Sequence, residues 1–120
     1  MYKLKTRHRI YASHKLKDQG GKCTRLHGHQ YEIILETHKN ELDYKNMVYD
    51  THEINERFNE FIQCDHLDLN TFMNEENPTM EYMSKYFYDN LKQKIPELYS
   101  VTVYETPEAS VTYKKELLCI

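Results

Sequence analysis

The chain has 120 residues, enough for one domain with an ordinary hydrophobic core. Hydrophobic residues make up 39% of the sequence and charged residues 29%, proportions typical of soluble globular proteins. No run approaches the roughly 20 apolar residues that span a membrane, and no apolar stretch follows the charged amino terminus. We therefore expect a single soluble domain, residues 1–120, with no signal peptide and no membrane partner.

Cysteine usage narrows the class of protein further. Cys23, Cys64 and Cys119 are odd in number and form no CxxC pair. This pattern argues against a disulfide framework and against a cysteine-based zinc site. Free thiols fit a reducing compartment, so the predicted location is the cytoplasm.

The net charge of −3 conceals a strongly basic amino-terminal segment. Residues 1–25 contain eight Lys or Arg and one acid, a net charge of +7, which leaves −10 for the remainder. Nucleic-acid binding is one interpretation, but no aromatic-rich basic motif accompanies these charges, and the isoelectric point is about 6.1. We expect a small polyanionic substrate instead of a nucleic acid, with a solvated strand face as the alternative explanation.

Alternating hydrophobicity predicts two strands near the amino terminus. In residues 2–14, apolar side chains and His14 share one parity, and basic side chains share the other. From His27 the alternation returns, with His29 and the following apolar residues on one face. All three histidines therefore belong to the apolar faces of two strands, which a long loop separates.

Two helices and two further strands complete the predicted topology. Asp50 or Thr51 is the expected amino-terminal cap of the first helix, and Thr79 that of the second. Each helix has one apolar stripe. Runs rich in β-forming residues, 99–106 and 110–114, close the chain. The order ββααββ predicts an α+β domain, an antiparallel four-stranded sheet with two helices on one face.

The motif His27-Gly-His29 is the most informative one, because its two imidazoles point to one face of the second strand. Two adjacent buried imidazoles are costly unless they share a metal ion or a hydrogen-bond partner. Strand parity makes His14 the best third ligand, and three protein ligands leave zinc a position open to water or substrate. A single histidine on a strand is more often structural, which is our interpretation of His8, His38 and His52.

Three further side chains are candidates for acid–base chemistry. Cys23 lies between Lys22 and Arg25, whose charges favour the thiolate, although a free cysteine is usually a buried filler. The adjacent residues Asp65 and His66 follow the first helix, and an aspartate can fix the tautomer of a histidine. Adjacency alone is a weak signal, because neighbouring residues do not have to interact.

Glu105 is out of place in a predicted strand unless its carboxylate has a partner. A buried carboxylate suits a ligand with two adjacent N–H donors, such as the edge of a pterin or guanine ring. A solvent-facing position at the edge of the sheet is the alternative interpretation.

Together these segments resemble the 6-pyruvoyl-tetrahydropterin and 6-carboxytetrahydropterin synthase family over nearly the whole chain. The resemblance rests on short motifs whose order and spacing are specific in combination: Tyr11-Ala-Ser-His14, Lys22-Cys…His27-Gly-His29, Met47-Val-Tyr-Asp50, Asp65-His66…Leu69-Asn70, Glu76-Asn-Pro-Thr79 with Glu81, and Val103-Tyr-Glu-Thr106. Two residues depart from the family pattern, since Asn46 replaces the usual glycine before Met-Val and Thr51 replaces a frequent aromatic.

The resemblance implies a tunnelling fold in which sheets from three subunits form a barrel, usually with two trimers stacked into a homohexamer. It also implies three groups of site residues: the zinc ligands His14, His27 and His29, the catalytic residues Cys23, Asp65 and His66, and the pterin anchor Glu105. The family builds its sites between subunits, so the catalytic residues do not have to meet within one chain.

The resemblance further indicates which reaction to expect. Only three residues separate Cys23 from His27, a short spacing similar to that of the carboxy-forming enzymes of queuosine and deazapurine biosynthesis. Those enzymes convert 7,8-dihydroneopterin triphosphate to 6-carboxy-5,6,7,8-tetrahydropterin and release acetaldehyde and triphosphate. The alternatives are the pyruvoyl-forming synthase, which stops at triphosphate elimination, and a non-catalytic zinc- or pterin-binding module on the same fold.

Overall fold

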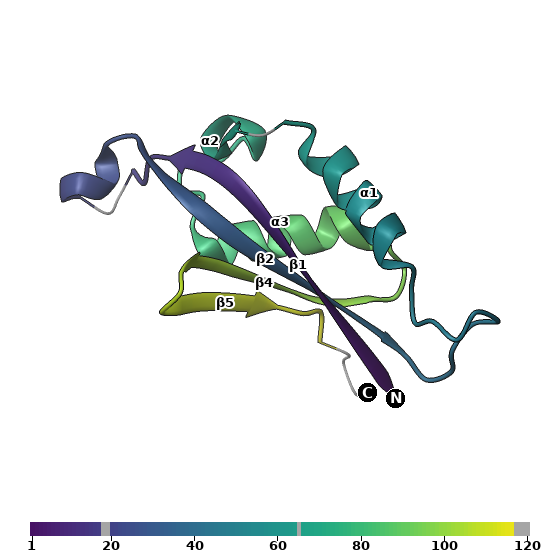
Figure 1. Cartoon of the computed structure of the whole chain (residues 1–120). Coiled ribbons are helices and arrows are strands. Elements are labelled where there is room, and N and C mark those ends of the chain that lie inside the picture. The colour runs from purple at the N-terminus through teal and green to yellow at the C-terminus, as the bar shows by residue number, and fades with distance from the viewer. Residues whose placement is uncertain (18–19, 65, 117–120) are drawn as a thin grey trace.

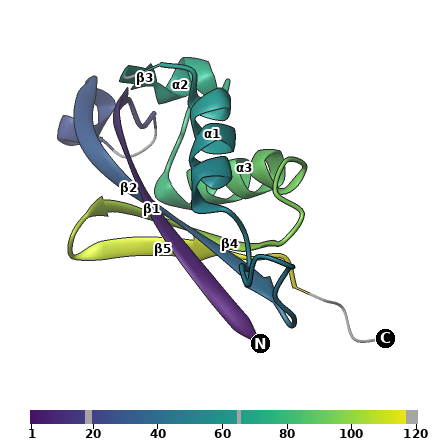
Figure 2. The same cartoon turned by 45° about the vertical axis from the view of Figure 1, so that its right-hand side comes forward.

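The structure is a computed structural model that describes residues 1–17, 20–64 and 66–116, with the side chains of residues 22 and 23 left out. Five strands form one sheet in the order β3-β1-β2-β4-β5. The strands are β1 (Tyr2–His14), β2 (His27–Lys39), β3 (His66–Asp68), β4 (Leu98–Thr106) and β5 (Ala109–Tyr113). The helical elements are the 3-10 helix η1 (Gly21–Thr24), α1 (Thr51–Ile62), α2 (Leu69–Phe72) and α3 (Met80–Lys92). Both long helices, α1 and α3, lie on the same side of the sheet (Figures 1 and 2).

The predicted α+β class and the four antiparallel strands are confirmed. β1 pairs with β2, β2 with β4 and β4 with β5, all antiparallel. The sheet gains a fifth strand that was not predicted, because β3 pairs parallel to β1 from Tyr11 opposite His66 to Ser13 opposite Asp68. A strand of three residues is too short to show an alternating pattern, so only its tertiary pairing defines it.

The hydrophobic core lies between the sheet and the two long helices. Ile33 and Leu35 of β2 are fully buried, as is Phe87 of α3. Phe58 of α1 is nearly as buried and also contacts the ring of His8, at a centroid distance of 4.4 Å. Burying such a side chain contributes on the order of 1.5–3 kcal/mol, so this layer holds the helices against the face of the sheet.

Side chains cap both long helices at their amino termini. The carboxylate of Asp50 accepts a hydrogen bond from the backbone N–H of His52 at 2.9 Å, which makes Asp50 the cap of α1. Thr79 caps α3, since its hydroxyl oxygen accepts from the N–H of Tyr82 at 3.2 Å. Each cap satisfies one of the helix N–H groups that have no partner within the helix, as expected from the sequence.

The loop before α1 explains one departure from the family pattern. Asn46 has a φ of 64°, in the left-handed region that glycine adopts freely and asparagine tolerates better than most residues. The carboxylate of Asp43 accepts from the N–H groups of Lys45 and Met47, at 2.8 and 3.0 Å, and so stabilises the turn. Asparagine is therefore compatible with the backbone conformation of this loop.

The basic residues of β1 lie on the face of the sheet away from the helices, where acidic residues of β2 oppose them. Lys5 pairs with Glu36 at 3.6 Å, and Arg7 and Arg9 both pair with Glu32, at 3.3 and 3.5 Å. These cations are mostly exposed, so the pairs add little stability, which fits the interpretation of a solvated strand face.

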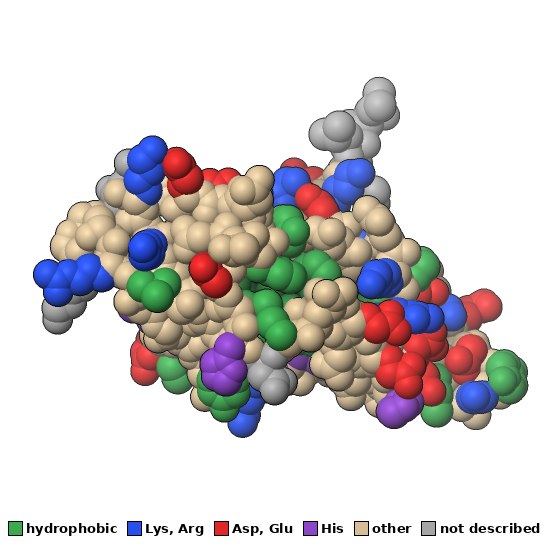
Figure 3. All heavy atoms as spheres, turned by 90° about the horizontal axis from the view of Figure 1, so that it is seen from above, with side chains coloured by type: hydrophobic (Ala, Val, Ile, Leu, Met, Phe, Trp, Pro, Cys, Tyr) green, Lys and Arg blue, Asp and Glu red, His purple; other side chains and the backbone are tan. Residues whose placement is uncertain are grey.

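Acidic and basic side chains are also interspersed on the molecular face seen from above, and hydrophobic side chains gather in a hollow near its middle (Figure 3). Within the described part of the chain, no helix is long and apolar enough to cross a membrane.

Candidate metal centre

Antiparallel pairing of β1 with β2 brings the three predicted histidine ligands together. His14, the last residue of β1, pairs directly with His27, the first residue of β2, and Ala12 pairs with His29. Because side chains alternate along a strand, the three imidazoles project from the face that the helices cover. His14 is buried, and His27 and His29 are partly exposed.

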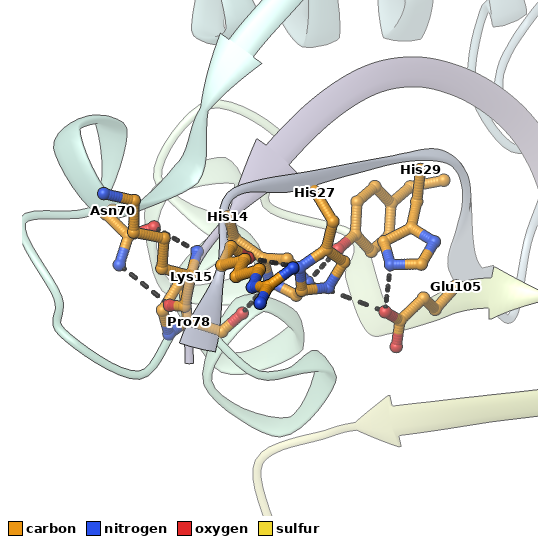
Figure 4. Close-up of polar contacts among 9 residues, drawn as sticks. His14, Lys15, His27, His29, Asn70, Pro78 and Glu105 are labelled. Carbon is orange, nitrogen blue, oxygen red and sulfur yellow. Dashed lines mark hydrogen bonds and ion pairs between the residues drawn. The ribbon is translucent and has the colours of Figure 1, made fainter. Parts of the chain in front are cut away.

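The three imidazole rings pack closely around a shared point. Ring centroids lie 4.5 Å apart for His14 and His27, 5.0 Å for His27 and His29, and 5.5 Å for His14 and His29. One ligand atom from each of these residues and from Glu105 of β4 lies within 4.8 Å of each of the others. Figure 4 shows the histidine side chains and Glu105 converging from β1, β2 and β4.

Backbone carbonyl groups orient two of the imidazoles. His14 Nδ1 lies 3.0 Å from the carbonyl oxygen of Pro78, and His27 Nδ1 lies 2.8 Å from that of Arg25. A carbonyl oxygen only accepts, so each Nδ1 carries the proton and donates it. Each Nε2 is then left with its lone pair, as in metal-binding histidines, whose other ring N–H usually donates to a carbonyl or carboxylate.

His29 and Glu105 form the other half of the cluster. His29 Nε2 lies 2.7 Å from Glu105 Oε1, and His14 Nε2 lies 3.6 Å from the same oxygen. Among the described residues, His29 Nε2 is a buried nitrogen without a hydrogen bond of acceptable geometry. A buried nitrogen of this kind is costly unless a ligand satisfies it.

The donor set fits a metal ion. Three imidazole nitrogens and a carboxylate oxygen are ligands that Zn²⁺ binds in proteins, and a set of three histidines leaves one position for water or substrate. The unsatisfied nitrogen of His29 and the Nδ1 hydrogen bonds of His14 and His27 both agree with coordination through Nε2. Among the described residues, these four side chains are the one group of His, Cys, Asp and Glu that lie close enough together to hold a metal ion.

Burial also favours the neutral form of His14. It lowers the pKa of His14 below its ordinary value, against the opposing effect of the hydrogen bond to Pro78. A neutral imidazole is the form that binds metals. Beside it, the hydroxyl of Tyr31 lies 3.4 Å from His14 Nε2, and burial raises the pKa of Tyr31, so this residue remains a neutral phenol.

The structure describes only part of the predicted catalytic set. His66 lies in β3, where its ring stacks on that of Tyr11 at a centroid distance of 5.6 Å. His66 also lines an open cavity of about 400 Å³ together with His29. The backbone of Cys23 belongs to η1, but its side chain and all of Asp65 lie outside the described residues. The role predicted for each of these residues stays a prediction.

The backbone acceptors of the site have no signature in the sequence. The carbonyl oxygens of Pro78 and Arg25 hold two of the histidines, and every residue has a carbonyl, so no residue type marks them. Asn70 was not among the predicted site residues, yet its side chain links the residue after His14 to the segment that contains Pro78. In the sequence, the motifs Leu69-Asn70 and Glu76-Asn-Pro-Thr79 are the features that point to Asn70 and Pro78.

Fold and site together define an α+β protein with a histidine-rich metal-ligand set at one end of its sheet. Comparison with known proteins places it in a family, because the sequence model of 6-pyruvoyl tetrahydropterin synthase matches residues 3–116. The chain therefore belongs to the 6-pyruvoyl tetrahydropterin synthase family, a family of pterin synthases.

Curated relatives carry two different names. The chain is 29% identical over 109 residues to the 6-carboxy-5,6,7,8-tetrahydropterin synthase of Synechocystis, covering 85% of this chain and 84% of the relative. It is 30% identical over 122 residues to the human 6-pyruvoyl tetrahydrobiopterin synthase, covering 91% of this chain and 84% of the relative. These identities are too similar to choose between the two reactions.

Solved structures agree with the family assignment. The 6-pyruvoyl tetrahydropterin synthase of Caenorhabditis elegans superimposes with a TM-score of 0.85 at 25% identity, covering 96% of each chain. The corresponding Plasmodium vivax enzyme has a TM-score of 0.72 at 15% identity, with 97% of this chain and 98% of that chain covered. The predicted fold is thus confirmed at the level of the single chain.

Proposed function

We propose that this protein is a zinc-dependent lyase that converts 7,8-dihydroneopterin triphosphate to 6-carboxy-5,6,7,8-tetrahydropterin, with release of acetaldehyde and triphosphate. The observation that carries the proposal is the convergence of His14, His27 and His29, with Nε2 of two of them freed for a metal by hydrogen bonds at Nδ1. The short spacing between Cys23 and His27 favours the carboxy-forming reaction over the pyruvoyl-forming one.

In this proposal the three histidines would hold Zn²⁺, which when bound would supply Lewis-acid polarisation of the side-chain hydroxyl groups of the substrate. Glu105 binds the pterin ring, since a carboxylate accepts two parallel N–H donors well. We expect the bound ring to lie next to the metal ligands, and the 2.7 Å distance between Glu105 Oε1 and His29 Nε2 supports this expectation.

The remaining residues move protons. Cys23, as a thiolate, removes a carbon-bound proton from the substrate side chain. Asp65 orients His66 and stabilises its charged form, so that His66 returns a proton as triphosphate leaves. Cleavage of the two-carbon fragment consumes one water, since the dicarbonyl side chain left by elimination gives an acid and an aldehyde only when water adds.

The proposed assembly is a homohexamer of two stacked trimers in the cytoplasm. In the described part of the chain, β5 forms one edge of the sheet, and β3 covers β1 only at Tyr11, Ala12 and Ser13, which leaves the remaining edge of β1 unpaired. Such long open edges favour pairing with another chain. Pairing between copies also provides a way for Cys23 and Asp65–His66 of different subunits to complete one site. Sedimentation of an active monomer at micromolar concentration would contradict this assembly.

The reaction is tested by incubating zinc-loaded protein with 7,8-dihydroneopterin triphosphate and identifying the pterin product by mass spectrometry. A 6-carboxytetrahydropterin product supports the proposal. A 6-pyruvoyl product assigns the protein to the other branch of its family, and an unchanged substrate leaves only a binding function.

A further inference from the structure

Asn70, in α2, makes four hydrogen bonds to backbone groups of two separate segments. Its Oδ1 accepts from the N–H of Lys15 at 2.9 Å, and its Nδ2 lies 3.0 Å from the carbonyl oxygen of Lys15. The same Nδ2 lies 3.2 Å from the carbonyl oxygen of Glu75 and 3.4 Å from that of Glu76. One amide therefore ties the end of β1 to the loop before α3. Figure 4 shows the contacts of Asn70 with Lys15.

The two segments joined by Asn70 are also the two that meet at His14. Lys15 directly follows His14, and Glu75 and Glu76 shortly precede Pro78, whose carbonyl oxygen accepts from His14 Nδ1 at 3.0 Å. The end of β1 and the segment 75–78 are thus connected twice, once by the hydrogen bond of His14 to Pro78 and once by the Asn70 amide.

The hydrogen bond between His14 and Pro78 has only one possible donor, His14 Nδ1. Proline has no N–H, so its backbone can only accept, and an acceptor at Nδ1 selects the imidazole tautomer that carries its proton there. The lone pair of His14 is then on Nε2, the nitrogen that lies 3.6 Å from Glu105 and faces the other ligands. The position of the 75–78 loop therefore decides which nitrogen of His14 is available to a metal.

We propose that Asn70 is a positioning residue of the metal site, acting through the Pro78 carbonyl to fix the tautomer and the orientation of His14. This role rests on the proposed metal-binding function. Loss of a partner that orients a metal ligand typically weakens metal binding by about 10- to 100-fold, and we expect a loss of this size when the amide is removed.

The experiment compares three variants with the wild-type protein. Asn70→Ala removes all four hydrogen bonds, and Asn70→Asp keeps the shape but replaces the donor that faces three carbonyl groups with an acceptor. Asn90→Ala is the matched control, because its amide also donates to a backbone carbonyl, that of Tyr86 at 2.8 Å, but lies within α3. Zinc affinity is measured by competition with a chromophoric chelator, and the His14 tautomer by two-bond ¹H–¹⁵N NMR of metal-free protein.

We expect Asn90→Ala to keep the wild-type zinc affinity and His14 to remain protonated at Nδ1. In both Asn70 variants zinc should bind about 10- to 100-fold more weakly, and the His14 signals should show protonation at Nε2 or a mixture of tautomers. Wild-type affinity and tautomer in a folded Asn70 variant would overturn the role of Asn70. Where Asn70→Ala does not fold, the isosteric Asn70→Asp decides. A wild-type protein that binds no zinc refutes the metal site instead, and the tautomer comparison still tests Asn70.

Discussion

Glu105 Oε1 lies 2.7 Å from His29 Nε2, closer than to any other described nitrogen of the cluster. The contact is compatible with two roles for this carboxylate. It either completes a four-ligand metal set or lies beside the metal and binds the pterin ring. The proposed function requires the second role, since a catalytic zinc must keep a position open.

Replacement of Glu105 separates these two roles. We expect Glu105→Gln to keep zinc, because the three histidines remain, and to bind the pterin about 10- to 100-fold more weakly, because a charge-assisted hydrogen bond is lost. Zinc content is measured by metal analysis and pterin binding by equilibrium titration. Loss of zinc together with unchanged pterin binding would make Glu105 a ligand instead of an anchor.

His27→Ala tests the ligand set itself. His27 is partly exposed, and its truncation removes one hydrogen bond, to the Arg25 carbonyl, so we expect the fold to stay intact. We expect the variant to purify as a folded protein with little or no bound zinc. His38→Ala is the control, since His38 pairs with Glu36 at 2.8 Å in a different part of β2. Full zinc occupancy in His27→Ala would rule out this ligand assignment.

Cys23→Ala distinguishes the role of the cysteine from that of the metal. The variant should keep its zinc, because the ligand set is complete without sulfur, and should lose turnover by about 10²–10⁴-fold, as when a positioned acid–base group is removed. Cys64→Ser is the control, because Cys64 is an exposed free thiol outside the metal cluster, and serine keeps a donor for the carbonyl oxygen of His66. Loss of zinc in Cys23→Ala would make it a ligand, and normal turnover would place the base elsewhere.

His8 predicts a measurable dependence of stability on pH. Its ring is buried against Phe58 and within 2.9 Å of the Thr6 hydroxyl, and burial lowers the pKa of His8 to about 4. Well above its ordinary pKa of 6.5 the residue is neutral in both the folded and unfolded states and contributes no pH dependence. Between pH 6.5 and 4, His8 binds more protons in the unfolded chain than in the folded chain, so the free energy of unfolding falls as the pH falls.

The size of this effect follows from the shift in pKa. At about pH 5 the His8 contribution amounts to a loss of about 2 kcal/mol relative to about pH 7.5. Urea unfolding of the wild type and of His8→Phe at both pH values measures it, since phenylalanine fills the same place beside Phe58 but does not titrate. An equal loss in both proteins would show that other groups cause the acid sensitivity.

Much of the candidate site follows from the sequence, because it rests on strand parity. The alternation in β1 and β2 places His14, His27 and His29 on one apolar face, and antiparallel pairing then puts His14 opposite His27. The caps Asp50 and Thr79 were equally predictable, since their side chains act within one turn of their own helix.

The rest of the site depends on tertiary contacts that have no local pattern. β3 is a strand only because it pairs with β1, and the carbonyl of Pro78 reaches His14 across 64 residues of sequence. The contact of Glu105 with His29 joins β4 to β2, and strand parity alone does not specify it. Parity predicts which side chains share a face, whereas the loops decide which backbone groups they meet.

The most direct test of the proposed reaction follows acetaldehyde and triphosphate release from 7,8-dihydroneopterin triphosphate in the same time course. We expect zinc-loaded protein to release the two products in equal amounts, and protein stripped with a chelator to release neither until zinc is restored. Release of triphosphate without acetaldehyde would contradict the carboxy-forming assignment, and equal release by the metal-free protein would contradict the role of the His14, His27 and His29 cluster.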